Sequence, residues 1–390
     1  SESGRFCRNL PRPSCEDALF RPGNVTEREG EMELGITGLP LTGKTTLFNA
    51  LTGEQRATGG FSSDKPSHLA VVKVPDERLD VLTAMFRPKK TVPADVKYVD
   101  VAGIVKGSAK DSRSGVLNAL RTVDALIHVV RAFESDSVPA PEGGINPVRD
   151  VGDLDLEMVL ADLEVAERRL DRLEKELKAG RKEGEREWTL LRSCRDALES
   201  EMPLRELNLT DEEEKLLRGF QFLTRKPIVV VVNVGEDQLG NESYRSTELA
   251  SLATRAKTEL IVLCAEAEMQ ISRLDAADQP AFLEALGISE PAVRRLVKVS
   301  YRLLDLISFF TVGPDEVRAW TVRSGALAPE AAGVIHTDLE RGFIRAEVIT
   351  YDDLVDCGSL AHAREKGLLR LEGKAYEVRD GDILNIRFSV

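Results

Sequence analysis

Short runs of apolar and β-branched residues recur before residue 265 and predict strands separated by helical patterns. Several runs are apolar throughout, which is typical of strands that are buried on both faces of a parallel sheet. Alternation of such strands with helices indicates an α/β fold with a mostly parallel sheet and right-handed crossovers. The predicted strands are MELGIT (32–37), LAVVKV (69–74), VKYVDV (96–101), ALIHVV (125–130), IVVVVNV (228–234) and LIVLC (260–264).

A different period interrupts this order and predicts an antiparallel helical coiled-coil hairpin over residues 151–204. Apolar residues follow the 3-4 spacing of a coiled-coil seam, a polar turn KAGRKEGERE comes next, and a second apolar stripe returns. The first stripe is Leu156, Val159, Leu163, Ala166, Leu170, Leu173 and Leu177, and the second is Trp188, Leu191, Cys194 and Leu198. The hairpin is expected as an insertion into the sheet domain, which then comprises residues 32–150 and 205–304.

The two ends of the chain have other textures. From about residue 305, short alternating strands such as ISFFTV, VRAWTV, FIRAEVI and YEVRDGDILNIRFSV predict a small α+β domain over 305–390. The RDGD stretch before the last strand suits a tight turn. Residues 1–31, rich in Pro, Arg, Glu and Gly, show no periodicity and are expected to be a disordered tail.

Composition narrows the possible functions. The chain has 390 residues, 42% hydrophobic and 31% charged, which fits a soluble globular protein of two or three domains. A formal net charge of −13 argues against a broad electrostatic grip on DNA or an anionic membrane, and leaves RNA only a local face. The five cysteines show no metal-binding spacing. With no apolar run long enough for a bilayer and no secretory signal, a cytoplasmic location is expected.

The stretch from Gly38 to Thr45 satisfies the GxxxxGK[ST] pattern between a predicted strand and a predicted helix, the context that this motif requires. The alternative is a glycine turn that merely opens a helix. In a phosphate loop, convergent backbone N–H groups and the helix N-terminus bind phosphates, Lys44 reaches the β- and γ-phosphates, and Thr45 ligates Mg²⁺. The predicted nucleotide-binding residues here are Gly38, Leu39, Pro40, Leu41, Thr42, Gly43, Lys44, Thr45 and Thr46.

Two further motifs follow later predicted strands. Asp100-Val-Ala-Gly103 is a DxxG motif, in which Asp100 would hold Mg²⁺ through water and Gly103 would sense the γ-phosphate. It argues against a P-loop kinase, the nearest alternative. Asn233-Val-Gly-Glu236 stands where guanine-specific proteins carry NKxD, so Asn233 and Glu236 are expected to face the base with weakened guanine specificity. The backbone of Cys264, Ala265 and Glu266 would flank the base.

With these motifs the chain resembles the YchF family, the Obg-like ATPases. The resemblance rests on GLPLTGKTTLFNALTG, YVDVAGIVKGSAK, the stretch from NPVRD to LADLE, NVGE and EVRAWTVRSGALAPEAAGVIHTDLERGFIRAE, and it extends from about residue 32 to the end. It implies a P-loop domain with a coiled-coil insertion and a C-terminal TGS domain of β-grasp fold. It also implies a preference for ATP over GTP, linked to NxxE, and association with the ribosome or RNA through the TGS and coiled-coil surfaces.

The chain departs from the family pattern near the expected γ-phosphate. Ser63 or Asp64 replaces the threonine of the first switch, and Ala140 stands where a loop histidine is usual. Ile104 follows DxxG, a hydrophobic residue that is usual for the family, so no water-positioning side chain is evident. His128 lies in mid-strand among apolar residues and is predicted to be a packed core imidazole.

The sequence therefore predicts a Mg²⁺-dependent protein that binds ATP in preference to GTP and hydrolyses it slowly, with Lys44, Thr45, Asp100 and Gly103 as the catalytic group. Catalysis would come mainly from electrostatic stabilisation. The alternatives are a nucleotide-gated binding module with little or no hydrolysis, and a GTP-binding protein. His336, Arg341 and Arg345 would lie either on a TGS surface that meets RNA or protein, or in a structural loop with solvated arginines.

Overall fold

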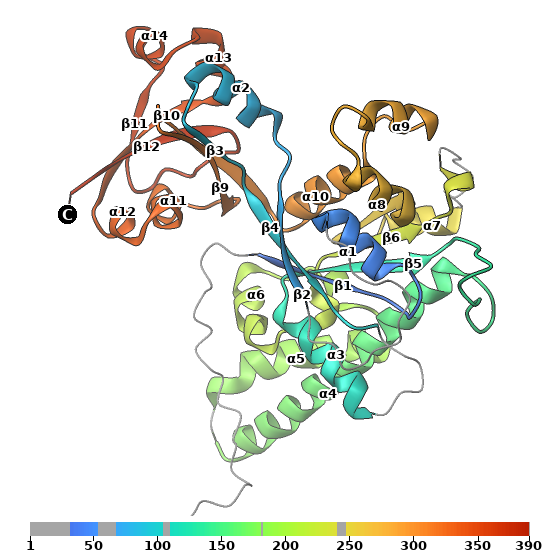
Figure 1. Cartoon of the computed structure of the whole chain (residues 1–390). Helices are drawn as coiled ribbons and strands as arrows, with labels where there is room; N and C mark the ends of the chain where they lie inside the picture. Colours follow the sequence, from blue (N-terminus) through green and yellow to red (C-terminus); the bar gives the residue numbers. More distant parts are fainter. Residues whose placement is uncertain (1–31, 54–67, 104–109, 181, 240–246, 390) are drawn as a thin grey trace, which may run out of the picture.

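The computed structural model describes residues 32–53, 68–103, 110–180, 182–239 and 247–389. The predicted tail (1–31) and the switch positions Ser63, Asp64 and Ile104 lie outside the described residues. The chain forms two six-stranded sheets and a helical hairpin that extends from the first sheet (Figure 1). No helix in these described ranges combines the length and the apolar character that crossing a membrane would require.

The first sheet has the order β2-β4-β1-β5-β6-β7 and confirms all six strands predicted before residue 265. Its strands are β1 (Glu33–Thr37), β2 (His68–Lys73), β4 (Asp95–Asp100), β5 (Ala125–Arg131), β6 (Ile228–Asn233) and β7 (Thr258–Leu263). All neighbours are parallel except β2, which runs antiparallel to β4 at the edge. The fully apolar runs of β5 and β6 are buried at every position, as expected for central parallel strands.

Helices cover both faces of this sheet. The helices α1 (Lys44–Thr52), α8 (Ala265–Arg273) and α10 (Ala292–Leu303) lie on one side (Figure 1). On the other side, α3 (Lys110–Thr122) and the start of α4 pack on β5 through a shared apolar cluster that contains Leu120, Leu126 and Leu154. The shorter helices are α6 (Asp211–Leu217), α7 (Thr247–Leu252) and α9 (Gln279–Ala285).

The helical hairpin consists of α4 (Pro147–Lys178) and α5 (Glu185–Glu199), and its separate core confirms most of the predicted seam. Asn146 caps α4 by accepting a hydrogen bond from the Arg149 backbone N–H, and Pro147 occupies the first turn. The helix thus begins four residues before the predicted boundary at 151, and its first turns lie on the sheet. Leu156 is not in the seam: it is 42% exposed, because this part of α4 faces the sheet with other residues.

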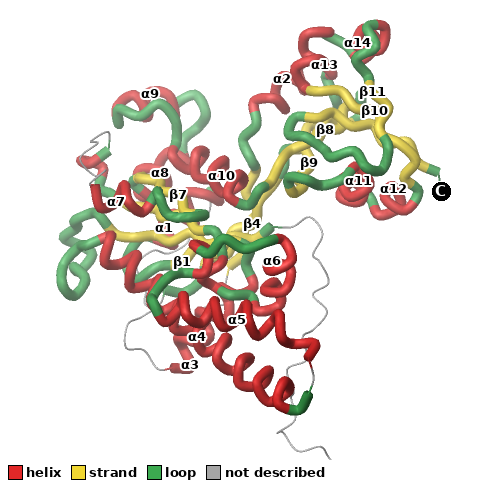
Figure 2. Tube along the Cα trace, turned by 180° about the vertical axis from the view of Figure 1, so that it is seen from behind, coloured by secondary structure: helices red, strands yellow, loops and turns green. Residues whose placement is uncertain are grey.

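The second sheet has the order β11-β10-β12-β8-β9-β3 and contains the C-terminal strands that the alternating pattern predicts. Its strands are β3 (Lys90–Val92), β8 (Leu306–Val312), β9 (Glu316–Arg323), β10 (Phe343–Thr350), β11 (Arg370–Glu372) and β12 (Asp382–Phe388). The accompanying helices are α11 (Ala328–Ile335), α12 (Thr337–Arg341), α13 (Tyr351–Cys357) and α14 (Leu360–Glu365). Figure 2 shows this part and the hairpin extending from the first sheet in different directions.

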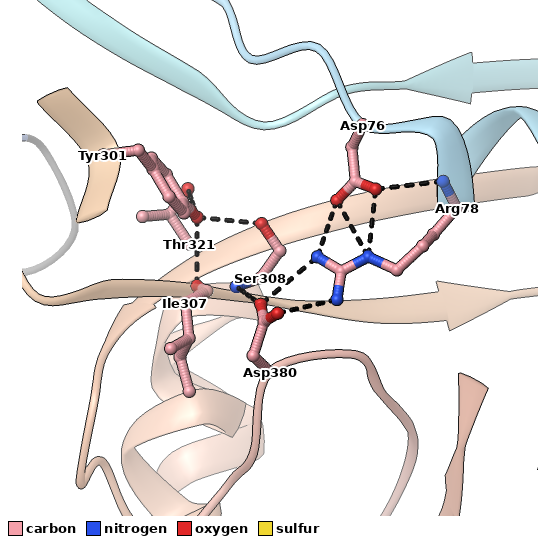
Figure 3. A network of polar contacts seen from close by, with 7 residues as sticks. All are labelled: Asp76, Arg78, Tyr301, Ile307, Ser308, Thr321 and Asp380. Carbon is pink, nitrogen blue, oxygen red and sulfur yellow. Dashed lines mark hydrogen bonds and ion pairs between the residues drawn. The ribbon is translucent and has the colours of Figure 1, made fainter. Parts of the chain in front are cut away.

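Residues 77–92 lie within the range that the sequence predicts for the first domain, but in the structure they contact the second sheet. Here α2 (Glu77–Phe86) packs near β8 and β9, and β3 pairs parallel with β9. Arg78 donates to Asp76 and, at 2.7 Å, to Asp380 in the turn before β12, while Asp380 accepts from the Ser308 backbone N–H at 2.9 Å (Figure 3). The chain between β2 and β4, which contains α2 and β3, is therefore an excursion from the first sheet to the second. Asp380 of the predicted RDGD turn binds this excursion through Arg78.

Tyr301 makes a second polar connection beside this ion pair. Its hydroxyl lies 2.9 Å from Ser308 Oγ and 3.1 Å from Thr321 Oγ1 (Figure 3). Tyr301 lies on α10, and its partners lie on β8 and β9. These hydrogen bonds therefore connect a helix that packs on the first sheet to the second sheet.

Candidate nucleotide-binding site

The loop from Gly38 to Gly43 connects β1 to α1 and has the backbone that its glycines predict. Gly38 has φ 146°, Leu41 61° and Gly43 94°, all in the region that favours glycine. A Cβ on Gly38 would lie 2.3 Å from the Val129 carbonyl oxygen, and one on Gly43 would lie 2.2 Å from Asn233 Nδ2. Both glycines are thus required by close neighbours as well as by the turn.

Lys44 is the first residue of α1 and folds back over the loop. Its Nζ donates to the Leu39 carbonyl oxygen at 2.6 Å. Burial lowers the pKa of Lys44 to about 8, although the negative charge of Asp100 opposes this shift. Thr45 and Thr46 follow in the first helical turn and are half-buried. The lysine charge, the Thr45 hydroxyl and the helix N-terminus are therefore gathered at one end of α1.

The DxxG motif lies directly against this loop. Asp100 ends β4 and pairs in register with Ile36 of β1, and the Val101 N–H donates to the Ile36 carbonyl at 3.0 Å. A Cβ on Gly103 would lie 2.7 Å from Lys44 Nζ and 2.9 Å from the Gly38 carbonyl oxygen. The structure therefore places Asp100 and Gly103 beside the lysine and the first glycine of the loop.

The residues predicted to hold Mg²⁺ fit that ion in kind. The Thr45 hydroxyl and the Asp100 carboxylate are hard oxygen donors, and Mg²⁺ in nucleotide sites usually takes its other ligands from phosphates and water. Asp100 is close enough to Lys44 to act on its pKa. Within the described ranges no group of three or more His, Cys, Asp or Glu side chains could hold a metal by itself.

Asn233 braces the site through its side-chain amide, beside the contact with the base that the sequence predicts. It is 4% exposed; its Nδ2 donates to the Thr42 carbonyl at 2.9 Å and its Oδ1 accepts from the Ala265 N–H at 2.9 Å. Both ends of the amide are thus committed to the protein. The sequence identified the residue but not this role, for which an asparagine at the end of a central strand was the available signal.

The remaining base-recognition residues lie around Asn233. Glu236 is exposed in a short 3-10 turn, 3.4 Å from Gln270 Nε2, whereas Val234 is buried. Cys264 and Ala265 are buried at the start of α8, and burial raises the pKa of the Cys264 thiol. Glu266 is exposed in the first turn of the same helix. Glu236 and Glu266 are therefore both exposed acidic side chains close to Asn233 and Ala265.

The other predicted positions lie outside the phosphate loop and the DxxG motif. His128 is fully buried on β5, and burial lowers its pKa to about 4, in agreement with a core imidazole. Ala140 is exposed in the loop before α4. His336 caps α12 by accepting from the Asp338 N–H at 3.1 Å, while Arg341 and Arg345 are exposed in the second sheet region.

Family profiles match both ends of the described chain. A profile described as 50S ribosome-binding GTPase matches residues 33–168, and the YchF-GTPase C-terminal profile, described as a protein of unknown function, matches residues 306–389. Together they span the phosphate loop, the DxxG motif and the second sheet.

Curated relatives match nearly the whole chain. The "Ribosome-binding ATPase YchF" of Bacillus subtilis is 44% identical over 364 residues, covering 91% of this chain and 99% of that protein. The protein of the same name from Escherichia coli O157:H7 is 41% identical, with the same coverage. The structure of the Schizosaccharomyces pombe YchF GTPase superposes with a TM-score of 0.80 at 30% identity, covering 92% of this chain and 98% of that one. The names of these relatives disagree on the nucleotide: two name an ATPase and one names a GTPase.

Proposed function

Because the chain belongs to the YchF family, we propose that it is a Mg²⁺-dependent ATPase that acts at the ribosome in the cytoplasm. The observation that carries the enzymatic part is the convergence of Lys44, Asp100 and Gly103 on the phosphate loop. The ribosomal part is supported by the names of relatives that align over nearly their entire length.

The proposed chemistry is mostly positioning and charge stabilisation. The loop backbone binds the phosphates, and Lys44, which now donates to Leu39, exchanges that carbonyl for phosphate oxygens. Thr45 and Asp100 would hold Mg²⁺, whose charge would stabilise the negative charge that develops on the phosphates. Ala140 offers no side chain that could position water, so slow turnover is expected.

We propose that ATP is preferred over GTP because of Glu236. In NKxD proteins a shorter aspartate accepts two hydrogen bonds from guanine, and the extra methylene of glutamate displaces this acceptor. Val234, buried in the core, also lacks the lysine stem that packs over guanine. Replacing Glu236 by Asp should lower the ratio of ATP affinity to GTP affinity, because it restores the shorter acceptor. Glu236 is exposed, so the substitution should leave the fold intact.

A second candidate function is a nucleotide-gated binding module with little or no hydrolysis, which Ala140 favours because it lacks a catalytic side chain. Phosphate release under single-turnover conditions separates the two. Release that depends on Mg²⁺ and Lys44 supports the ATPase. Stable ATP-bound protein with no release supports the binding module.

Association with the ribosome is tested by co-sedimentation. We propose that the hairpin and the second sheet supply the contact surface, with the exposed Arg341 and Arg345 as candidates for RNA phosphates. Wild-type protein should sediment with ribosomes in a salt-sensitive manner, and Arg341→Glu with Arg345→Glu should weaken it. Equal sedimentation of the double variant would remove this surface from the proposal.

A further inference from the structure

One level of the packing between the first sheet and α4 is polar. Thr37 and His128 are register partners on β1 and β5, and both are 0% exposed. Leu126, two residues before His128 and so on the same face of the strand, packs in one cluster with Leu154 and Met158 of α4. Thr37 and His128 therefore point toward α4, into a layer that is otherwise filled by aliphatic side chains.

Two charged residues face this level from the hairpin side. Asp155, one turn beyond Val151 on the buried side of α4, accepts hydrogen bonds from Arg205 Nη2 and from Arg255 Nη1, the latter at 2.9 Å. Arg205 lies in the turn after α5 and is 4% exposed. Burial lowers the pKa of His128, and the charges of Asp155, Lys44 and Arg205 also act on it. The helix α4, which carries Asp155, packs on the strand that carries His128.

Several polar atoms at this level have no protein partner. Among the described residues, no hydrogen bond reaches Thr37 Oγ1, either ring nitrogen of His128, or Arg205 Nε and Nη1. A buried polar group without a partner is costly, and nearly all such groups in folded proteins bond to protein or to an ordered water. Five orphaned atoms on three buried residues therefore indicate that a ligand is bound at this level.

The chemistry of these atoms selects the ligand. Arg205 offers only donors, whereas the imidazole, kept neutral by burial, has one donor and one acceptor nitrogen. A ligand that satisfies both residues must accept from Arg205 and donate to the acceptor nitrogen of His128. Water does both, whereas chloride cannot donate to a ring nitrogen. An open pocket of about 500 Å³, lined by Asp155, Glu206 and Arg255, adjoins the ion pair.

We propose that Thr37, His128, Asp155 and Arg205 enclose a buried water site that connects the phosphate loop to the root of the helical hairpin. Thr37 directly precedes Gly38, and His128 Cδ2 lies 3.4 Å from the position of a Cβ on Gly38. Asp155 lies on α4, which continues outward as the first helix of the hairpin. The water thus bridges the element that binds nucleotide and the element that leaves the domain.

The most direct test is a high-resolution crystal structure of the nucleotide-free wild-type protein. We expect ordered water within hydrogen-bond distance of Thr37 Oγ1, a His128 ring nitrogen and Arg205. The protein has four histidines, so ¹⁵N-histidine spectra assigned with His128→Gln provide a solution check. Ring nitrogens of His128 with the shifts of hydrogen-bonded imidazole support the site. A dry cavity and free-imidazole shifts would overturn the proposal.

Matched variants give a thermodynamic readout that does not depend on nucleotide. Thr37→Val and His128→Leu should lower Tm, and His128→Gln should lower it less, because Gln can still donate and accept. Thr37→Val and Arg205→Met should be non-additive, since both bond the same water. Thr258→Val is the control: among the residues that the structure describes, its hydroxyl donates to the Ala256 carbonyl at 3.1 Å, outside the proposed site. If Thr37→Val and His128→Leu instead raise Tm, the level is dry and the site does not exist.

Discussion

At the scale of single residues, the contact between Gly103 and the phosphate loop is the most sensitive point of the site. A methyl group on Gly103 would meet Lys44 Nζ at 2.7 Å and the backbone oxygen of Gly38 at 2.9 Å. The lysine can move, but the backbone oxygen cannot move without distorting the loop.

We therefore expect Gly103→Ala to weaken ATP binding by about tenfold or more, equivalent to about 1.4 kcal/mol. Titration with a fluorescent ATP analogue measures this change. Ala102→Ser, at the exposed neighbouring position, is the control and should bind normally. Unchanged affinity in Gly103→Ala would show that the two motifs separate when nucleotide binds.

Asn233 is expected to matter for stability as well as for binding. Asn233→Ala removes two buried hydrogen bonds and leaves the Thr42 carbonyl and the Ala265 N–H without partners. The expected loss is about 2–4 kcal/mol in the free energy of unfolding. Denaturant unfolding measures it, with Glu236→Ala as an exposed control that should change stability little. Equal stability of both variants would contradict the bracing role.

Lys226 gives a prediction for pH. Its ammonium donates to the carbonyls of Arg121 and Val123 at the end of α3, and burial lowers its pKa from 10.5 to about 8. Because the folded pKa lies below the unfolded one, protonation favours the unfolded chain, and this penalty is full below pH 8.

The stability of the wild type relative to Lys226→Met should therefore rise between pH 8 and pH 10. Paired denaturation curves at several pH values measure it, because titrations elsewhere cancel in the difference. Parallel pH dependence in the two proteins would mean that burial does not shift this group.

At the scale of elements, the excursion formed by α2 and β3 depends on Arg78. Its side chain is 28% exposed and bridges Asp76 and Asp380, and it also lies over the Phe310 ring at 5.2 Å. These contacts raise the pKa of Arg78, so the guanidinium stays charged.

Arg78→Met should cost roughly 1–3 kcal/mol of stability, because it removes the guanidinium that donates to two carboxylates. Lys89→Met is a matched control, since Lys89 joins the same segment to Asp315 through side chains that are 82% and 80% exposed. Such an exposed pair contributes little. Thermal unfolding of both variants measures the difference in their loss of stability. Equal losses would contradict a larger contribution from the partly buried contacts of Arg78.

The sequence predicts elements well where a pattern is long or chemically specific. The mostly apolar runs of β5 and β6 and the heptads of α4 predict which residues are buried. The phosphate loop requires glycines because its backbone takes positive φ values. The three-residue β3 carries no such signal, because it is a strand only through pairing with β9. Leu156 fits the seam by spacing, but its surroundings are set by the sheet and not by the hairpin.

At the scale of the whole molecule, the nucleotide site is connected to both other parts. Asp100 ends β4, and β4 follows directly on the α2–β3 excursion that joins the second sheet. His128 of β5 faces α4, the root of the hairpin. Neither connection was predictable, because each depends on contacts between residues distant in sequence. The motifs identified the site residues, and tertiary structure determined what Asn233, Asp155 and Asp380 do.

The most direct test of the central claim is calorimetric titration of ATP and GTP with Mg²⁺, with Lys44→Ala as control and phosphate release followed on the same samples. We expect ATP to bind more tightly than GTP, and Lys44→Ala to lose binding of both nucleotides. We also expect slow release of phosphate from ATP. Tighter binding of GTP, or binding that survives Lys44→Ala, would contradict the claim.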